Sequence, residues 1–273
     1  LVGSAVSNPD KLALDLQFAA DKTLTARKGP TPVFTRASTA TFVGSNGLIQ
    51  SAAINGPRFD HDPVTLACKG LLIEESRTNL FFRSDDFTNT AWAKTGLTVS
   101  GDITTSPDGL TTGDLLSEDS STSVHAAQQT NFTLTALQSY TYSVFAKANS
   151  HTSVQLSLST TAFAPGLFAN FILTGSGSVG TSSGLTTRIE PYSNGWYRCS
   201  VTLSSASGGV GGSAAIVVNN NNSSAVRNVS YSGAGAQAFY VWGAQLEAGA
   251  FPTSYIPTTT ASVIRSADVC SIT

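Results

Sequence analysis

The sequence predicts an all-β protein built around an antiparallel β-sandwich. Apolar and polar residues alternate along several short runs, and Gly, Pro, Asn and Asp separate these runs. No long window shows the apolar spacing of an amphipathic helix. The 273 residues suffice for one large β domain or two smaller ones.

Four runs in the second half of the chain carry the clearest alternation, and each is expected to be a strand with one face toward a core. These inward faces lie within residues 140–146, 154–158, 197–203 and 214–218. The run from Phe239 to Ala244 is apolar on both faces, so it needs cover on both. After turns at Gly249 and Pro252, we expect Tyr255 and Ile256 to be buried against residues 12–82.

The first 80 residues predict a separate set of short strands that packs on the sandwich, because no Gly/Ser linker divides the halves. Leu12 to Phe18 alternates as one strand, and residues 34–43 form the first arm of a hairpin that returns over 48–50. Residues 57–63 are rich in turn formers, and residues 70–75 predict a short strand. Glu74 and Glu75 should point to opposite faces of that strand.

Low charge narrows the range of partners. Charged residues make up 12% of the chain and its net charge is −2, whereas a typical soluble domain has about 25% charged residues. No Lys/Arg cluster is present, which argues against nucleic acid and anionic membrane surfaces as partners. A polar, uncharged surface suits packed assemblies and glycan contact. Because the chain contains no Met, we expect a processed or partial chain.

Several motifs in a fixed order resemble a family of tailed-bacteriophage virion proteins described as head spike, fibre or tail-associated structural proteins. They are FTRASTATF at 34–42, PRFD at 57–60, GLLIEESRTNL at 70–80, DDF at 85–87, AW at 91–92, NGWYR at 194–198, WGAQLEAG at 242–249 and TSYIP at 253–257. The resemblance covers about residues 12–273.

The resemblance implies three parts: an N-terminal, partial lectin-like β segment over 1–79, a jelly-roll like that of carbohydrate-binding modules over 80–258, and an extension over 259–273. It also implies a place in the virion, and contact with other virion proteins and with copies of the chain, most simply as a homotrimer. Host cell-surface glycan is a further implied partner.

Catalytic machinery is not evident in the sequence. His61 lies in a turn, His125 and His151 lie in Ser/Thr-rich stretches expected at the surface, and no Gly-x-Ser-x-Gly motif occurs. We therefore assign no catalytic residue. Glycoside cleavage by paired carboxylates remains an alternative, and its candidate residues are Asp60, Asp62, Glu74, Glu75, Asp85, Asp86 and Glu247.

Structural calcium is the one cofactor that the sequence leaves open. Carboxylates beside turns offer the oxygen ligands that Ca²⁺ prefers, and the candidates are Asp60, Asp62, Asp85 and Asp86. Ordinary turn capping by Asp is the alternative. Cys68, Cys199 and Cys270 show no zinc spacing and are expected to be free, buried side chains.

Aromatic residues are the candidates for glycan contact. Trp92, Tyr192 and Tyr231 lie among polar residues and could stack on sugar rings, whereas Trp196 and Trp242 lie in apolar strands and are expected in the core. The sequence thus predicts a non-enzymatic virion structural protein. A glycan-binding module for host recognition and a glycan depolymerase are the two alternatives.

Overall fold

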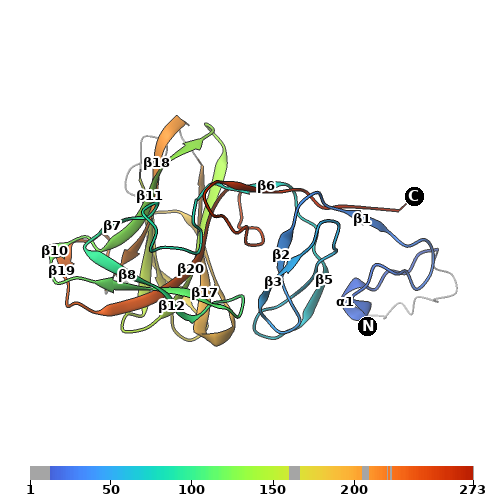
Figure 1. The fold of residues 1–273 in the computed structure, drawn as a ribbon, viewed down its shortest axis with the longest axis horizontal. Helices are drawn as coiled ribbons and strands as arrows, with labels where there is room; N and C mark the ends of the chain where they lie inside the picture. The colour runs from blue at the N-terminus through green and yellow to red at the C-terminus, as the bar shows by residue number, and fades with distance from the viewer. Residues whose placement is uncertain (1–12, 160–166, 205–208, 220, 222, 273) are drawn as a thin grey trace, which may run out of the picture. The chain divides into compact units, whose positions relative to one another are not determined.

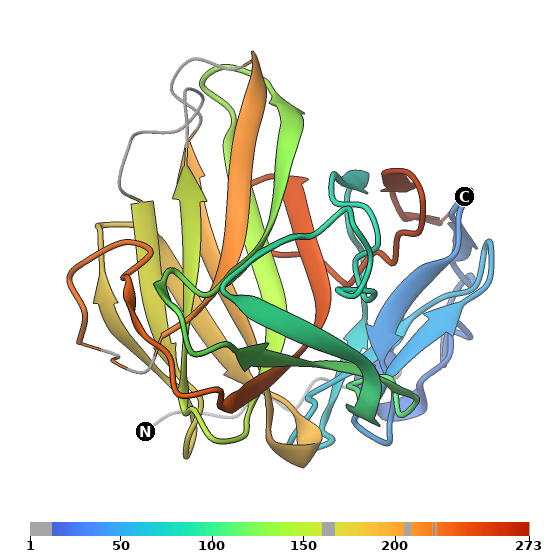
Figure 2. The same ribbon diagram turned by 60° about the vertical axis from the view of Figure 1, so that its left-hand side comes forward.

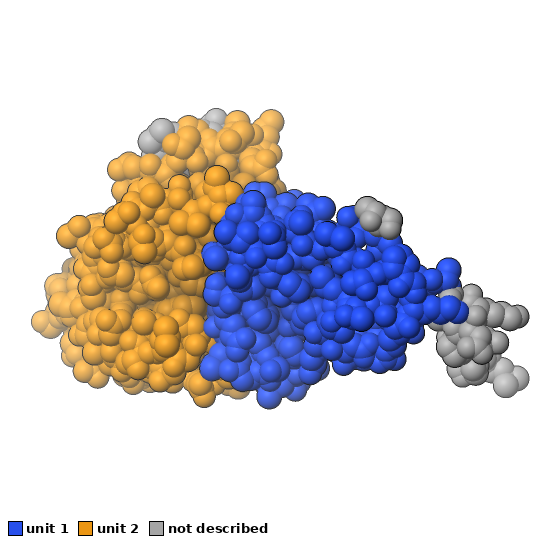
Figure 3. All heavy atoms as spheres, turned by 45° about the vertical axis from the view of Figure 1, so that its right-hand side comes forward, with its two compact units in different colours: residues 1–76, 265–273 blue, residues 77–264 orange. Residues whose placement is uncertain are grey.

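The structure is a computed structural model that describes residues 13–159, 167–204, 209–219, 221 and 223–272. It forms two compact units: residues 1–76 with 265–273 (unit 1) and residues 77–264 (unit 2) (Figure 3). The all-β antiparallel class is confirmed. The division lies after residue 76 rather than 79, and the end of the chain belongs to unit 1 rather than forming an extension.

Unit 2 is a sandwich of two six-stranded antiparallel sheets (Figure 1, Figure 2). Sheet I has the order β15 (Ser178–Ser182), β14 (Leu167–Ile172), β13 (Ser153–Ser159), β18 (Gly209–Val218), β11 (Ala126–Leu134) and β7 (Ala93–Thr95). Sheet II has the order β16 (Thr186–Pro191), β17 (Trp196–Ser204), β12 (Ser139–Ala148), β20 (Gln237–Ala248), β9 (Thr111–Glu118) and β8 (Leu97–Thr105). A short ladder joins β10 (Thr122–Ser123) to β19 (Tyr231–Ser232), and a 3-10 turn, η2, spans Ser193–Gly195.

The core of unit 2 lies between the two sheets. All four sets of residues expected to face inward belong to it, from β12, β13, β17 and β18. Their removal from water is the main favourable term for a sandwich, at roughly 25 cal/mol per Å² of apolar surface. Alternation alone therefore identified the buried face of these four strands correctly.

The β20 strand departs from simple alternation at a bulge. Phe239 and Val241 belong to the sandwich core, and after Gly243 the core residues are Ala244 and Leu246. Gly243 has a φ of 62°, and the pairing of β20 with β12 shifts register beside it. A residue in the left-handed region inserts one extra position and reverses which residues face inward. The expected alternation, with Phe239 and Val241 on one face and Trp242 and Ala244 on the other, therefore holds through Trp242 and is wrong at Ala244, which faces the core.

The outer face of sheet II carries a second aromatic cluster, covered by the segment that follows β20. Trp242 and Phe145 have ring centroids 5.4 Å apart, and Trp242 and Tyr255 have centroids 4.6 Å apart. Tyr255 and Ile256 are buried, as predicted. The Tyr255 hydroxyl lies 2.6 Å from Ser84 Oγ, so its polar contact is just beyond the predicted range of 12–82.

Unit 1 is built from three two-stranded antiparallel ladders, β1 with β22, β2 with β3, and β4 with β5. The elements are α1 (Phe18–Asp21), β1 (Val33–Thr35), β2 (Ala40–Val43), β3 (Ile49–Ala52), β4 (Phe59–His61), β5 (Cys68–Leu71) and β22 (Val269–Ser271). At the boundary, β6 (Arg77–Asn79) pairs with β21 (Val263–Arg265).

Several local predictions for unit 1 need correction. The β2–β3 hairpin is confirmed, with Val43 opposite Ile49, but residues 36–39 interrupt the expected long first arm. The run that ends at Phe18 is not one strand, because Phe18 begins a helix; Leu12 lies outside the described residues. Strand β4 lies inside the segment expected to be only turns. These strands are three or four residues long, too short for alternation to define them.

A buried ionic cluster joins the end of the chain to the rest of unit 1. The Asp268 carboxylate pairs with Arg36 at 3.0 Å and with Arg58, and all three side chains are fully buried. Arg58 also pairs with Glu74 at 2.7 Å, and Arg265 pairs with the same carboxylate. Carbonyl oxygens accept further guanidinium donors: those of Ser38, Thr41 and Glu75 accept from Arg36, Arg58 and Arg265 respectively.

A second buried polar junction lies in unit 2, where β6 meets the segment after β20. Asn79 donates from Nδ2 to the carbonyls of Ala244 and Ile256, at 3.1 and 2.9 Å. Glu247 accepts from the amide and hydroxyl of Thr253, and Arg198 donates to the Thr253 carbonyl at 2.8 Å. These bonds fix the course of the segment, because each satisfies a buried polar group.

Cys68, Cys199 and Cys270 are free, as expected; Cys199 is fully buried and the other two are half-buried. Among the residues that the structure describes, no helix combines the length and the hydropathy that a bilayer span requires.

Candidate ligand-binding site

Trp92 lies in the core of unit 2 rather than on a binding face. Its side chain is fully buried, with ring centroids 5.4 Å from Phe81 and 4.6 Å from Phe87. Its indole Nε1 donates to the Arg83 carbonyl at 2.9 Å. Neighbouring rings cover the indole, so a sugar could not stack on Trp92 in this conformation. The expectation that Trp92 is available to a glycan is therefore wrong. The polar residues near Trp92 in the sequence gave no sign of the rings that pack on it in the fold.

Tyr192 and Tyr231 are both half-buried, and the residues around them differ. Tyr192 packs edge-on against Phe145, with centroids 5.0 Å apart. Tyr231 donates its hydroxyl hydrogen to the Glu118 carboxylate, and its ring packs at a tilt against His125, with ring centroids 4.6 Å apart. Burial, together with this bond to Glu118, raises the pKa of Tyr231 well above its usual range. As glycan contacts, both tyrosines stay predictions.

Asp60 and Asp62 are engaged by backbone amides and face Lys69. Asp60 accepts from the Val43 amide at 2.8 Å, and burial raises its pKa. Asp62 accepts from the amides of Thr65 and Val64, which lower its pKa. Lys69 Nζ lies 4.0 Å from Asp60 and 3.9 Å from Asp62. Asp62 therefore shows the turn capping that was the alternative to calcium, whereas Asp60 bonds across strands to Val43.

Asp85 and Asp86, in unit 2, line an acidic cleft together with two carboxylates that the sequence reasoning missed. The cavity holds about 280 Å³ and is also lined by Asp102 and Asp114. Burial raises the pKa of Asp85, and the nearby charges of Asp108, Asp86 and Asp102 raise it further. Asp102 and Asp114 come from the β8–β9 hairpin, and only the folded hairpin brings them to the DDF motif.

Asp114 is the most perturbed carboxyl of this cleft. It is 2% exposed, and burial raises its pKa to about 6, although the amides of Asp102 and Phe87 donate to its two oxygens. Both oxygens thus hold backbone in place. Over the described parts of the chain, no three His, Cys, Asp or Glu side chains form an arrangement that fits a metal ion. Calcium binding stays a prediction, and this cleft is where it would be tested.

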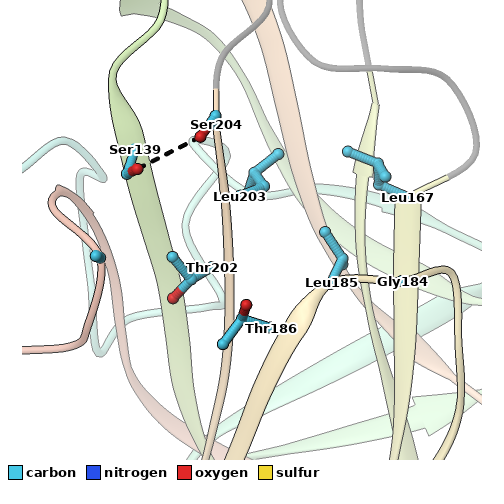
Figure 4. A pocket seen from close by; sticks show the side chains of 9 residues that line it. Ser139, Leu167, Gly184, Leu185, Thr186, Thr202, Leu203 and Ser204 are labelled. Atoms are coloured by element: carbon cyan, nitrogen blue, oxygen red, sulfur yellow. Dashed lines mark hydrogen bonds between the residues drawn. The ribbon is translucent and has the colours of Figure 1, made fainter.

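A larger, uncharged pocket lies in unit 2 where β12, β16 and β17 of sheet II come close to β14 of sheet I (Figure 4). Its volume is about 470 Å³. Figure 4 shows the side chains of Leu167, Leu185 and Leu203 pointing toward one another on one side. The remaining lining residues are Ser139, Gly184, Thr186, Thr202, Ser204 and Ala250.

The hydroxyls of this leucine–hydroxyl pocket are positioned by strand neighbours. Ser139 Oγ lies 3.4 Å from Ser204 Oγ, and Thr202 Oγ1 lies 2.8 Å from Thr141 Oγ1. Thr186 is exposed at the rim. Apolar wall and neutral hydroxyls together suit an uncharged, hydroxyl-bearing ligand with one apolar face, as in a neutral sugar. Sequence reasoning did not find this pocket, because its residues are ordinary strand and loop residues spread over 112 positions from 139 to 250.

No protein-family profile and no curated protein matches the chain. Four solved chains match it in structure. One is the enzymatically active domain of tailspike protein 4 of bacteriophage CBA120, which is 14% identical with a TM-score of 0.35. The match covers 61% of this chain and 21% of that chain, so this chain spans about a fifth of the tailspike structure. At this identity and TM-score, the similarity does not bear on function.

Proposed function

We propose that this protein is a non-enzymatic structural component of a tailed-bacteriophage virion, as a fibre, spike or decoration on head or tail. The proposal is supported by what the residues of these motifs do in the fold. In unit 1, Arg36, Arg58 and Glu74 from three motifs meet Asp268 in the buried ionic cluster. In unit 2, Asn79 from the same motif as Glu74, together with Arg198 and Glu247 from two others, forms the buried polar junction.

These motif residues hold the framework together through ion pairs and hydrogen bonds inside it. A catalytic carboxylate or nucleophile has to reach a substrate, and Glu247 is fully buried against Thr253. A motif set that fixes architecture is what a mechanical component requires. That the motif residues hold the framework is the observation that carries the proposed structural role.

Labelling of intact particles tests the proposal. A gold-labelled antibody against the folded chain should bind purified virions at regular positions, as seen by electron microscopy. Particles of an unrelated phage serve as the control. Particles free of label, with the chain found only in the lysate, would remove the virion role.

The absence of hydrolytic activity is tested separately. The purified chain should release no reducing ends from host-surface polysaccharides. If release occurs and is lost in Glu75→Gln or Asp86→Asn, the depolymerase alternative replaces the structural reading. Asp86 lines the acidic cleft and Glu75 is exposed, so both variants are expected to fold.

A second candidate function, adhesion to a neutral glycan, is favoured by the leucine–hydroxyl pocket. Binding on a glycan array should fail in Thr186→Lys, because the long side chain would fill the rim of the pocket. Thr130→Lys makes the same change at an exposed strand position outside it and should bind like the unaltered chain. Equal binding by both variants would exclude this pocket as the glycan site.

Self-association into a homotrimer follows from the virion role, since closed symmetry is the usual form of such components. Light scattering at high concentration should give a mass of about three chains. A stable monomer of 28.2 kDa under the same conditions would count against it.

A further inference from the structure

Two histidines expected at the surface are instead largely covered at one end of unit 2: His125 is fully buried within a small arm, and the His151 side chain, beside Glu118, is 11% exposed. The arm comprises residues 119–125 and 231–236, and its centre is the β10–β19 ladder. It is attached by the Gly233 amide, which donates to the Ser121 carbonyl at 3.1 Å, and by the Asp119 amide, which donates to the Gly96 carbonyl at 2.9 Å.

His125 lies between the β7–β8 turn and β19, and its side chain is fully buried. Its Nδ1 is within hydrogen-bond distance of the Gly96 carbonyl, and its Nε2 lies 3.3 Å from the Tyr231 carbonyl. Both partners can only accept. A neutral imidazole has a single N–H and can donate to one of them, whereas the imidazolium donates to both. The geometry of the closed arm therefore fits the protonated ring better.

Glu118 provides the second contact. Its carboxylate is 4% exposed; it accepts from the Ala234 amide at 2.8 Å and from the Tyr231 hydroxyl, both in the arm. Burial tends to raise the pKa of Glu118, but these bonds and the nearby histidines outweigh it, so the pKa is lowered. Glu118 is therefore ionised throughout the range in which histidine titrates.

His151 faces this carboxylate from the β12–β13 loop. Its Nε2 lies 3.4 Å from Glu118 Oε2, and 11% of its side chain is exposed. Its Nδ1 lies 3.2 Å from Ser150 Oγ. A protonated His151 would form a largely buried ion pair with Glu118. With a neutral His151, the Glu118 carboxylate would accept hydrogen bonds from neutral donors only.

The charges around the arm also favour protonated histidines. Asp119 Oδ1 lies 3.7 Å from His125 Nδ1, with half of its side chain exposed, and the Tyr231 hydroxyl stays neutral because its pKa is raised. With both histidines neutral, Glu118 and Asp119 leave two uncompensated negative charges. With both protonated, the four groups balance. Among the described residues, neither carboxylate has an ion pair with Lys or Arg.

We propose that the arm is a proton-operated clamp, which closes firmly when His125 and His151 are protonated and loosens when they are neutral. Whichever state binds protons more tightly is favoured by acid. The closed arm has four acceptor atoms facing the two rings, and opening would expose the rings to water. Acidification therefore favours the closed arm.

Amide hydrogen exchange on the full chain tests the clamp at about pH 5.5 and about pH 7.5, on either side of the range in which histidine titrates. After correction for intrinsic rates, protection of the arm should be about tenfold higher at the lower pH, which corresponds to about 1.4 kcal/mol. Protection of β12 and β17 in the core provides the internal reference. Arm protection that is equal at both pH values would overturn the proposal.

Variants separate the histidines from other titrating groups. The double variant His125→Gln with His151→Gln should lose the pH response, and His61→Gln, in unit 1, should retain it. An undiminished response in the double variant would refute the clamp. Should His125→Gln not fold, His151→Gln alone and Glu118→Gln alone each remove the same ion pair, so each should reduce the response by a similar factor. A full response in both single variants would equally refute the clamp.

Discussion

Asp268 shows how much of unit 1 depends on one side chain. Its carboxylate lies between two guanidinium groups with no exposure of any of the three side chains. Taking these charges out of water is costly, and they are stable there only as a paired set. In the sequence, Arg36, Arg58 and Asp268 are separated by up to 232 positions, and nothing in their local patterns links them.

Removing this carboxylate should destabilise unit 1 strongly. Asp268→Ala leaves Arg36 and Arg58 buried with one carboxylate partner fewer, and loss of one partner of a buried pair costs about 3–5 kcal/mol. Denaturant unfolding followed by circular dichroism measures the effect. Asp21→Asn breaks the exposed Asp21–Arg27 pair of the same unit and should change little. Equal effects of the two variants would mean that the cluster is not a structural anchor.

Asp114 should make the stability of unit 2 depend on pH. Its pKa is 3.8 in the reference state and about 6 in the fold, so the protonated form is favoured by folding. Its contribution is therefore fully present below about pH 4 and is lost as the pH rises through about 6. Tryptophan-detected unfolding at a series of pH values should show this decline, flattened in Asp114→Asn. Asp62→Asn, in unit 1, should leave the tryptophan profile unchanged; a flattened profile there would contradict the assignment to Asp114.

Among the elements, β20 shows where sequence pattern is informative and where it fails. Its need for cover on both faces could be predicted, because Tyr240 and Trp242 are as apolar as their neighbours. The bulge at Gly243 could not be located, because glycine in a strand permits a bulge without specifying one. A built Cβ on Gly243 would lie 3.0 Å from a Phe145 ring atom, so packing as well as backbone conformation requires glycine here.

The bulge gives a prediction with a matched control. Gly243→Ala and Gly184→Ala both place a side chain at positive φ, 62° and 80° respectively, which costs about 1–2 kcal/mol. Only Gly243 adds the close contact with Phe145, since nothing lies within 4 Å of a Cβ on Gly184. Thermal unfolding should therefore show the larger loss for Gly243→Ala. Indistinguishable losses would indicate that Phe145 moves aside freely.

At the scale of the whole molecule, alternation and turn residues were enough to predict the all-β class and the inward faces of four strands. The acidic cleft was predictable only in part. Asp85 and Asp86 were found because they are carboxylates beside a predicted turn, while Asp102 and Asp114 reach the cleft only through the β8–β9 hairpin. Burial of Trp92 and His125 was not predictable either, because the groups that pack on them, such as Phe81 on Trp92 and Tyr231 on His125, come from other parts of the fold.

The two units can be followed separately, because Trp92, Trp196 and Trp242 all belong to unit 2. Tryptophan fluorescence thus reports unit 2, whereas circular dichroism reports both units. Asp268→Ala is expected to lower the midpoint seen by circular dichroism while moving the fluorescence midpoint much less. Equal shifts of both signals would show that the units unfold as one.

The central claim is that this chain is a structural part of a virion, with its motif residues holding a framework. A density map of intact particles tests this most directly. The account predicts symmetry-related copies of the two-sheet sandwich on head or tail, with residues 265–272 seated against Arg36 and Arg58 in each copy. A particle map in which every external component is accounted for by other chains would contradict it.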